Sequence, residues 1–182
     1  MDTQFNDITL HPIGVVRSIT KQPFLIADET GIKMRDDIAP TIDEVRKTEK
    51  TISDVVLNRD LAEHLEGIEE YSHIKIIYWA HDVPRKARDI KKVHPMGNPE
   101  YPLVGLFSTC SPARPNPILT TVVRLVGKEG TTLHVTGLDA IDGSPVLDIK
   151  PHVGEFYPAE GVKIPDWMEK IQSTVMQRKT ND

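Results

Sequence analysis

Short apolar runs separated by turn-forming residues constrain the fold of this chain more than any other feature of its sequence. β-Branched residues cluster in these runs, and glycine, proline, asparagine or aspartate separates them, which is the pattern of strands. The runs cover residues 13–16, 52–57, 74–79, 104–107, 122–126, 133–138 and 146–149. Seven or so short strands with few helices predict a mostly β fold, a small antiparallel β-barrel with short flanking helices.

Residues 132–136 show the strand pattern most clearly, because Leu133 and Val135 alternate with threonine and histidine. Residues 127–130 should form the hairpin turn before this strand. Two segments predict helices. Residues 60–68 begin with Asp60 as a candidate N-cap. Residues 165–179 open with a first-turn proline and repeat apolar residues every four positions, so this helix should pack on the barrel or on a partner subunit.

Length and composition favour one domain over residues 1–182, because 38% hydrophobic residues are enough for a single core. We expect residues 18–50 to form a charged insertion or lid and residues 165–182 to form a C-terminal helix and tail. The single cysteine, Cys110, excludes a disulfide within the chain and is typical of a reducing compartment. No apolar run approaches the roughly 20 residues of a membrane span, so we expect a cytoplasmic protein with no membrane segment.

A net charge of -5 argues against a chain that coats nucleic acid through its overall field. A local basic cluster nevertheless lies in residues 82–95. Such a cluster either contacts phosphates or forms a solvated surface. Its members are Arg85, Lys86, Arg88, Lys91 and Lys92.

The segment Ser108–Ile118, STCSPARPNPI, has the most unusual composition. Three prolines within six residues exclude a helix or a continuous ladder, so a stiff loop should follow a strand here. Arg114 and Asn116 project from a loop of this kind, which would recognise a polar small molecule at little ordering cost. The alternative is a structural turn with a solvated arginine.

A second candidate segment, residues 138–151, places three carboxylates near a D-G turn. Asp139, Asp142 and Asp148 could hold a cation, accept hydrogen bonds from ribose hydroxyls or bind a hard metal. Asp142 also has a simple turn explanation. In the third segment, residues 70–81, the aromatic residues either fill the core or stack on bases, and His73 and His81 either carry protons or pack.

Several common sites are missing from the sequence. No histidine pair has HxxxH spacing and Cys110 has no CxxC partner, so we expect no metal site. No G-x-G is present, so a Rossmann-type nucleotide loop is not expected either.

The sequence resembles the TsaA/TrmO-like family, which is known for a tRNA N6-adenine methyltransferase. The resemblance covers most of residues 11–153 and rests above all on SPARPNPI and LDAIDGSPVLDIKP. It implies a small β-barrel, usually a homodimer, that binds S-adenosylmethionine and methylates N6 of threonylcarbamoyladenosine beside the tRNA anticodon. Carried over by position, the implied cofactor-binding residues are Ser111, Arg114, Pro115, Asn116, Ile118, Leu138, Asp142, Ser144, Val146, Asp148 and Lys150.

Methyl transfer to a carbamoylated N6 needs a group that removes its proton, and the candidates are Asp139, Asp142 and His73. The basic cluster in residues 82–95 is the candidate tRNA contact. This chain departs from the family where Cys110 replaces the usual arginine and where Leu119 follows the loop in place of glycine. The remaining functional alternatives are methylation of a small metabolite and a non-catalytic barrel that binds a nucleotide or RNA.

Overall fold

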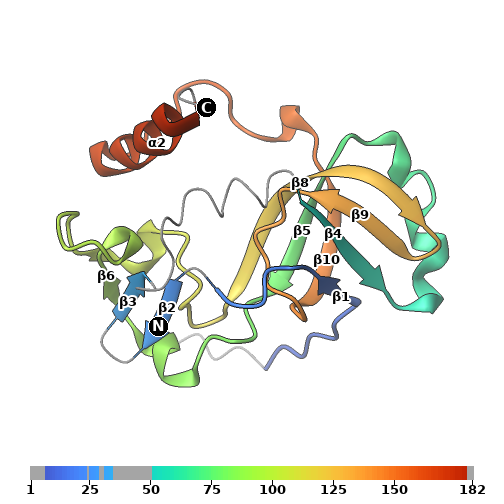
Figure 1. The fold of residues 1–182 in the computed structure, drawn as a ribbon, viewed down its shortest axis with the longest axis horizontal. Coiled ribbons are helices and arrows are strands. Elements are labelled where there is room, and N and C mark those ends of the chain that lie inside the picture. Colours follow the sequence, from blue (N-terminus) through green and yellow to red (C-terminus); the bar gives the residue numbers. More distant parts are fainter. Residues whose placement is uncertain (1–6, 24, 29–30, 35–50, 180–182) are drawn as a thin grey trace.

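Six antiparallel strands close into a barrel in the computed structural model, which describes residues 7–23, 25–28, 31–34 and 51–179 (Figure 1). The strands follow one another around the barrel in the order β1, β10, β5, β8, β9 and β4. This arrangement confirms the predicted small antiparallel barrel. The barrel strands are β1 (Gly14–Arg17), β4 (Ile52–Leu57), β5 (His73–Trp79), β8 (Ile118–Glu129), β9 (Thr132–Thr136) and β10 (Pro145–Pro151).

The barrel interior is built from the alternating apolar residues of these strands. In β5 every second residue is buried, and β4 and β9 show the same alternation. Leu133 and Val135 of β9 are fully buried, as the sequence pattern predicted. The other apolar residues of the barrel strands with no exposed surface are Val16, Val55, Ile74, Ile76 and Val146. Burial of one face of each strand is the main driving force for closing the barrel.

Two small antiparallel sheets lie outside the barrel. Figure 1 shows β2, β3 and β6 together at one end of the molecule and the barrel at the other end. One sheet pairs β2 (Leu25–Asp28) with β3 (Gly31–Met34), so part of the predicted insertion forms a hairpin. The rest of the insertion beyond residue 34 lies outside the described residues. The other sheet pairs β6 (Lys92–Val93) with β7 (Val104–Gly105).

The prediction of a helix over residues 60–68 was wrong in kind. The chain forms two 3-10 helices there, η1 (Arg59–Leu65) and η2 (Ile68–Glu70), because Gly67 between them adopts a left-handed φ of 78°. The N-cap position is Asn58, which makes no side-chain capping bond, and not Asp60. Segments this short are often 3-10, since a nine-residue α-helix is marginal without strong packing.

Two strand boundaries also differ from the prediction. The strand expected over residues 104–107 ends at Gly105, and the 3-10 helix η5 (Leu106–Ser108) follows it. β8 continues to Glu129, so the hairpin turn lies at residues 130–131 and not at 127–130. Gly127 sits in the strand at a register shift, where β8 bulges opposite β9. The sequence analysis placed Gly127 in the turn, whereas the structure places it in β8.

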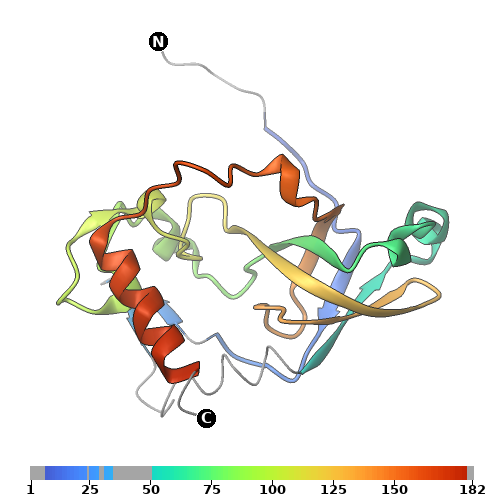
Figure 2. The ribbon, with the colours of Figure 1, turned by 90° about the horizontal axis from the view of Figure 1, so that it is seen from above.

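The C-terminal helix α2 (Asp166–Lys179) confirms the predicted helix and begins directly after Pro165. It stands away from the barrel in both Figure 1 and Figure 2. The remaining short elements are the 3-10 helices η3 (Arg85–Asp89), η4 (Pro95–Gly97) and η6 (Gly154–Phe156). Over the described part of the chain, no helix has the length and apolarity that crossing a membrane requires.

Candidate functional site

The loop Ser108–Ile118 and the segment around Asp139 meet at the end of the barrel where β5 finishes. Ala80, just after β5, donates its backbone N–H to the carbonyl oxygen of Pro117 at 2.8 Å. Tyr78, two residues earlier, donates its hydroxyl to the main-chain carbonyl oxygen of Asp139. Two segments that the sequence marked separately are therefore tied to one strand end.

The proline-rich loop is stiffened by its own hydrogen bonds. The Arg114 guanidinium donates from Nη1 to the carbonyl oxygens of Thr109 at 2.8 Å and Ser111 at 3.2 Å. Ser111 Oγ accepts the backbone N–H of Ala113 at 3.2 Å. Ser111 and Ala113 are buried. Arg114 thus holds the loop together, and a ligand role for it is confined to its other guanidinium nitrogens.

The exposed side of the same loop is mixed in polarity. Pro115 and Asn116 are exposed, and Ile118 at the start of β8 is partly exposed. The ring of Phe107 is 77% exposed, and the Arg114 guanidinium lies 5.5 Å from its centroid. This surface offers an amide and two apolar groups to a ligand.

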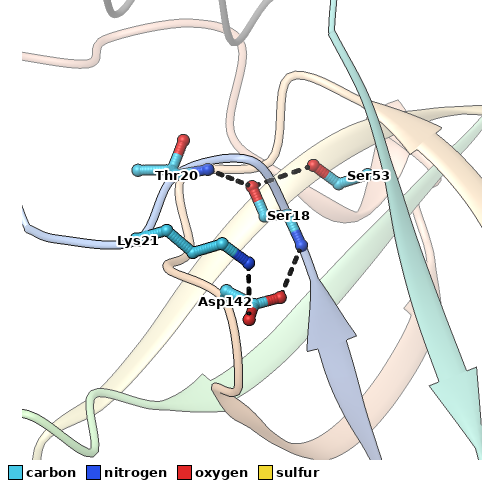
Figure 3. Close-up of polar contacts among 5 residues, drawn as sticks. All are labelled: Ser18, Thr20, Lys21, Ser53 and Asp142. Carbon is cyan, nitrogen blue, oxygen red and sulfur yellow. Dashed lines mark hydrogen bonds and ion pairs between the residues drawn. The ribbon is translucent and has the colours of Figure 1, made fainter.

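Asp142 links the D-G turn to the residues that follow β1, as Figure 3 shows. Its Oδ1 accepts the backbone N–H of Ser18 at 3.0 Å, and its Oδ2 pairs with Lys21 Nζ at 2.8 Å. Its own backbone N–H donates to the carbonyl oxygen of Thr20 at 2.7 Å. Ser18 Oγ in turn accepts the Thr20 N–H at 3.1 Å. Contacts on both sides of the turn fix its position relative to β1.

These contacts make Asp142 a weak base. The Lys21 ammonium, followed by the Ser18 N–H, lowers the pKa of its carboxyl, because both favour the charged form. Gly143 follows in a left-handed conformation with a φ of 81°, which the turn requires. The geometry gives Asp142 a positioning role and disfavours it as the group that accepts a proton.

Asp139 differs from Asp142 in its exposure and in the direction of its pKa shift. The residue as a whole is exposed, between Leu138 and Ala140, which are both buried. The protein around its carboxyl disfavours the charged form by desolvation and so raises the pKa of Asp139. A carboxyl with a raised pKa is a stronger base than an ordinary aspartate, and the backbone carbonyl of the same residue accepts the Tyr78 hydroxyl.

The two histidines proposed as proton carriers lie at different ends of β5. A Cβ at Gly143 would lie 3.7 Å from His81 Nε2, so the His81 ring lies beside the D-G turn. His81 Nε2 also lies 3.4 Å from Asp82 Oδ1. His73 opens β5, is exposed and contacts Ser72 Oγ at 2.9 Å. His73 and Tyr78 are five residues apart, about 16 Å along a strand, so the structure does not bring His73 to the Tyr78–Asp139 end.

The other implied cofactor residues separate into a buried and an outer group. Leu138, Ser144 and Val146 are all at most 2% exposed; Val146 belongs to β10, whereas Leu138 follows β9 and Ser144 precedes β10. Among the described groups Ser144 Oγ has no hydrogen-bond partner. Asp148 and Lys150 pair with each other at 2.7 Å on the outer face of β10. Leu138, Ser144 and Val146 are therefore buried inside the protein, whereas Asp148 and Lys150 face solvent.

The predicted basic cluster is not a uniform charged surface. Arg88 is half-buried, lies over the Trp79 ring at 5.4 Å from its centroid and donates from Nη2 to the Val83 carbonyl oxygen at 3.4 Å. Arg88 therefore packs η3 against β5. Four members remain exposed, namely Arg85, Lys86, Lys91 and Lys92.

Sequence reasoning did not single out Ser18 or Lys21, and it left Tyr78 open between a core residue and a base-stacking residue. No local signal identifies Ser18, because its partner Asp142 is 124 residues away. Tyr78 is buried as expected, and only the fold shows that its hydroxyl reaches Asp139. Over the described ranges, no three His, Cys, Asp or Glu side chains are grouped to hold a metal ion.

Comparison with known proteins shows the family to which this chain belongs. A family model described as the tRNA-methyltransferase O N-terminal domain matches residues 38–157. A probable S-adenosyl-L-methionine-binding protein of Pyrococcus abyssi is 37% identical over 163 residues, which are 90% of this chain and 77% of that protein. The mouse tRNA (adenine(37)-N6)-methyltransferase is 36% identical over 109 residues, which are 60% of this chain and 25% of the mouse protein.

A solved structure is also similar. The crystal structure of TrmO from Pseudomonas aeruginosa superposes with a TM-score of 0.64 at 25% identity, over 91% of this chain. This chain spans 64% of that protein, slightly less than two thirds. The family model matches most of the chain and includes both the proline-rich loop and the D-G turn. The chain therefore belongs to the tRNA-methyltransferase O N-terminal domain family.

Proposed function

We propose that this protein is an S-adenosylmethionine-dependent methyltransferase that acts on N6 of threonylcarbamoyladenosine beside the tRNA anticodon. The observation that carries the proposal is the meeting of the proline-rich loop with the Asp139 segment at the Tyr78 end of β5. Relatives named as S-adenosyl-L-methionine-binding proteins support the cofactor, and the mouse relative supports the acceptor.

The accessible residues of the site fit the chemical groups of this cofactor. The Asn116 amide is exposed and offers both a donor and an acceptor to the polar groups of the cofactor. Phe107 and Ile118 provide apolar surface for an adenine ring. The cofactor supplies the electrophilic methyl group. The stiff loop lowers the entropy cost of holding any ligand here.

Asp139 is our choice for the group that accepts the N6 proton. The residue as a whole is exposed, and its raised pKa makes it more basic than Asp142. Tyr78 positions the backbone of Asp139, while Asp142 positions the adjoining turn. Proton acceptors of this kind contribute roughly 10²- to 10⁴-fold to a rate.

We further propose that tRNA contacts the exposed members of the basic cluster, Arg85, Lys86, Lys91 and Lys92. Modification of tRNA in the cytoplasm is consistent with this assignment. The protein should form a homodimer through α2, because α2 stands away from the barrel while its apolar residues Trp167 and Ile171 are spaced on one side. Light scattering of the wild type and of Trp167→Glu tests the dimer, and a wild-type monomer would refute it.

The decisive experiment uses tRNA that carries threonylcarbamoyladenosine without the N6 methyl group. Purified protein and S-adenosylmethionine should convert this nucleoside to its methylated form, as read by mass spectrometry of digested tRNA. Asp139→Asn should abolish the conversion while calorimetry still detects cofactor binding. Cofactor binding without tRNA methylation would favour a small-molecule acceptor, and the absence of cofactor binding would favour a non-catalytic RNA-binding barrel.

A further inference from the structure

Basic side chains form a row across three neighbouring strands on the outer face of the barrel. The strand register places Arg124 of β8 opposite His73 of β5, and Lys75 of β5 opposite Lys150 of β10. His73 and Lys75 are two residues apart and so share a face. The residues between and after them on β5 are fully buried, which places the row on the outside.

Lys75 is held in place by aromatic residues that follow β10. Its Nζ lies 4.3 Å from the centroid of the Tyr157 ring and donates to the Tyr157 hydroxyl. The Tyr157 ring stacks on His152 with centroids 5.2 Å apart and an interplanar angle of 28°. A lysine ordered in this way loses less conformational entropy when it binds an anion.

The row is positive although the chain as a whole is negative. It contains three cations, Arg124, Lys75 and Lys150, of which Lys150 pairs with the carboxylate of Asp148 at 2.7 Å. An ammonium group has three donors, so Lys150 keeps capacity for a second anion. Tyr157, which contacts Lys75, is 41% exposed, and Phe156 next to it in the chain is 78% exposed.

We propose that this row, defined by Arg124, Lys75 and Lys150, is a docking surface for the phosphates of RNA. Cations beside exposed aromatic rings are the combination that binds nucleic acid, since phosphates pair with the cations and unstacked bases pack on the rings. The row is separate from the basic cluster of residues 85–92. The identification of the RNA as tRNA rests on the proposed function.

The row is suitably placed for a substrate that reaches the candidate site. Lys75 precedes Tyr78 by three residues, about 10 Å along β5. The two side chains point to opposite faces of β5, so an RNA molecule that contacts the row with its backbone reaches the Tyr78–Asp139 site with a single nucleotide by passing over the end of the strand. An extended contact of this kind compensates for the overall negative charge of the protein.

The test is tRNA affinity as a function of salt for the wild type, for Lys75→Gln/Arg124→Gln, and for the control Arg59→Gln/Lys163→Gln. The control removes two positive charges from exposed positions outside the row. Each lost phosphate contact lowers the slope of log affinity against log salt by about 0.7 to 0.9, so the row variant should lose about 1.4 to 1.8. Its affinity for S-adenosylmethionine should match the wild type, which shows that the variant is folded even though loss of the Lys75–Tyr157 contacts lowers its Tm.

Equal slopes for the row variant and the wild type would overturn the proposal, and so would an equal loss in the control. A wild type that binds vesicles of phosphatidylglycerol but no tRNA would replace RNA with an anionic lipid surface. Methylation of the same tRNA is measured in parallel. A reduced slope in the row variant, together with no methylation by the wild type, would support the row and refute the proposed function. Methylation by the wild type, together with equal slopes for the row variant and the wild type, would support the proposed function and refute the row.

Discussion

Replacing Tyr78 with phenylalanine removes a single oxygen atom and tests how the site is held together. Tyr78 is 3% exposed, and its hydroxyl donates to the Asp139 carbonyl oxygen and lies 3.4 Å from Thr121 Oγ1. Burial, reinforced by the nearby Asp139 charge, raises the pKa of Tyr78. The hydroxyl therefore keeps its proton and remains a donor across the physiological pH range.

The cost of Tyr78→Phe follows from the loss of a part-buried hydrogen bond. A carbonyl shielded from water that loses its donor costs about 1 to 3 kcal/mol. For a chain of this size, 1 kcal/mol lowers the Tm by roughly 2 to 4 °C, so the Tm should fall by about 2 to 12 °C. Because Asp139 loses its positioning contact, kcat for methyl transfer should fall while the KM for S-adenosylmethionine changes little.

Urea denaturation, thermal unfolding and steady-state kinetics measure these effects. Tyr71→Phe is the matched control, since Tyr71 is 42% exposed on the same segment, and it should leave stability and kcat unchanged. A Tm of Tyr78→Phe within 1 °C of the wild type, with an unchanged kcat, would show that the contact neither stabilises the fold nor positions Asp139.

Three further predictions concern individual charges. Asp142→Asn should lower the free energy of unfolding at neutral pH. Contacts lower the folded pKa of Asp142 below the ordinary 3.8, so the difference from the wild type should shrink as the pH falls through that value. Asp60→Asn is the control, and a difference independent of pH would contradict the stabilising role of the Asp142 contacts. The acid limb of the pH–rate profile should lie above the ordinary aspartate pKa, because desolvation raises the pKa of Asp139 and the rate rises as this carboxyl loses its proton. An unchanged acid limb in Asp139→Glu, or full activity in Asp139→Asn, would exclude Asp139 as the base. Arg88→Gln should lower the Tm through its contacts with Trp79 and Val83, whereas Arg85→Gln should weaken tRNA binding without a Tm change, and the opposite pattern would reverse the two roles.

The sequence alone determined the class of the fold and the segments that carry the chemistry. Alternation in residues 132–136 and the short apolar runs predict strands because side-chain direction has a period of two, which any half-buried strand must obey. The prolines of residues 108–118 likewise predict a stiff loop, since each removes a backbone donor and fixes a dihedral angle. These are local constraints, and they hold wherever the segment lies in the fold.

Only the tertiary structure decided which of these segments work together. Asp139 and Asp142 are three residues apart and look alike in sequence, yet the structure pairs Asp142 with Lys21 and Ser18 and leaves Asp139 accessible at the Tyr78 contact. His73 and His81 are distinguished in the same way, by their positions at opposite ends of β5. Protonation and hydrogen bonding depend on neighbours brought together by barrel closure, over separations of up to 124 residues, and no local pattern encodes those neighbours.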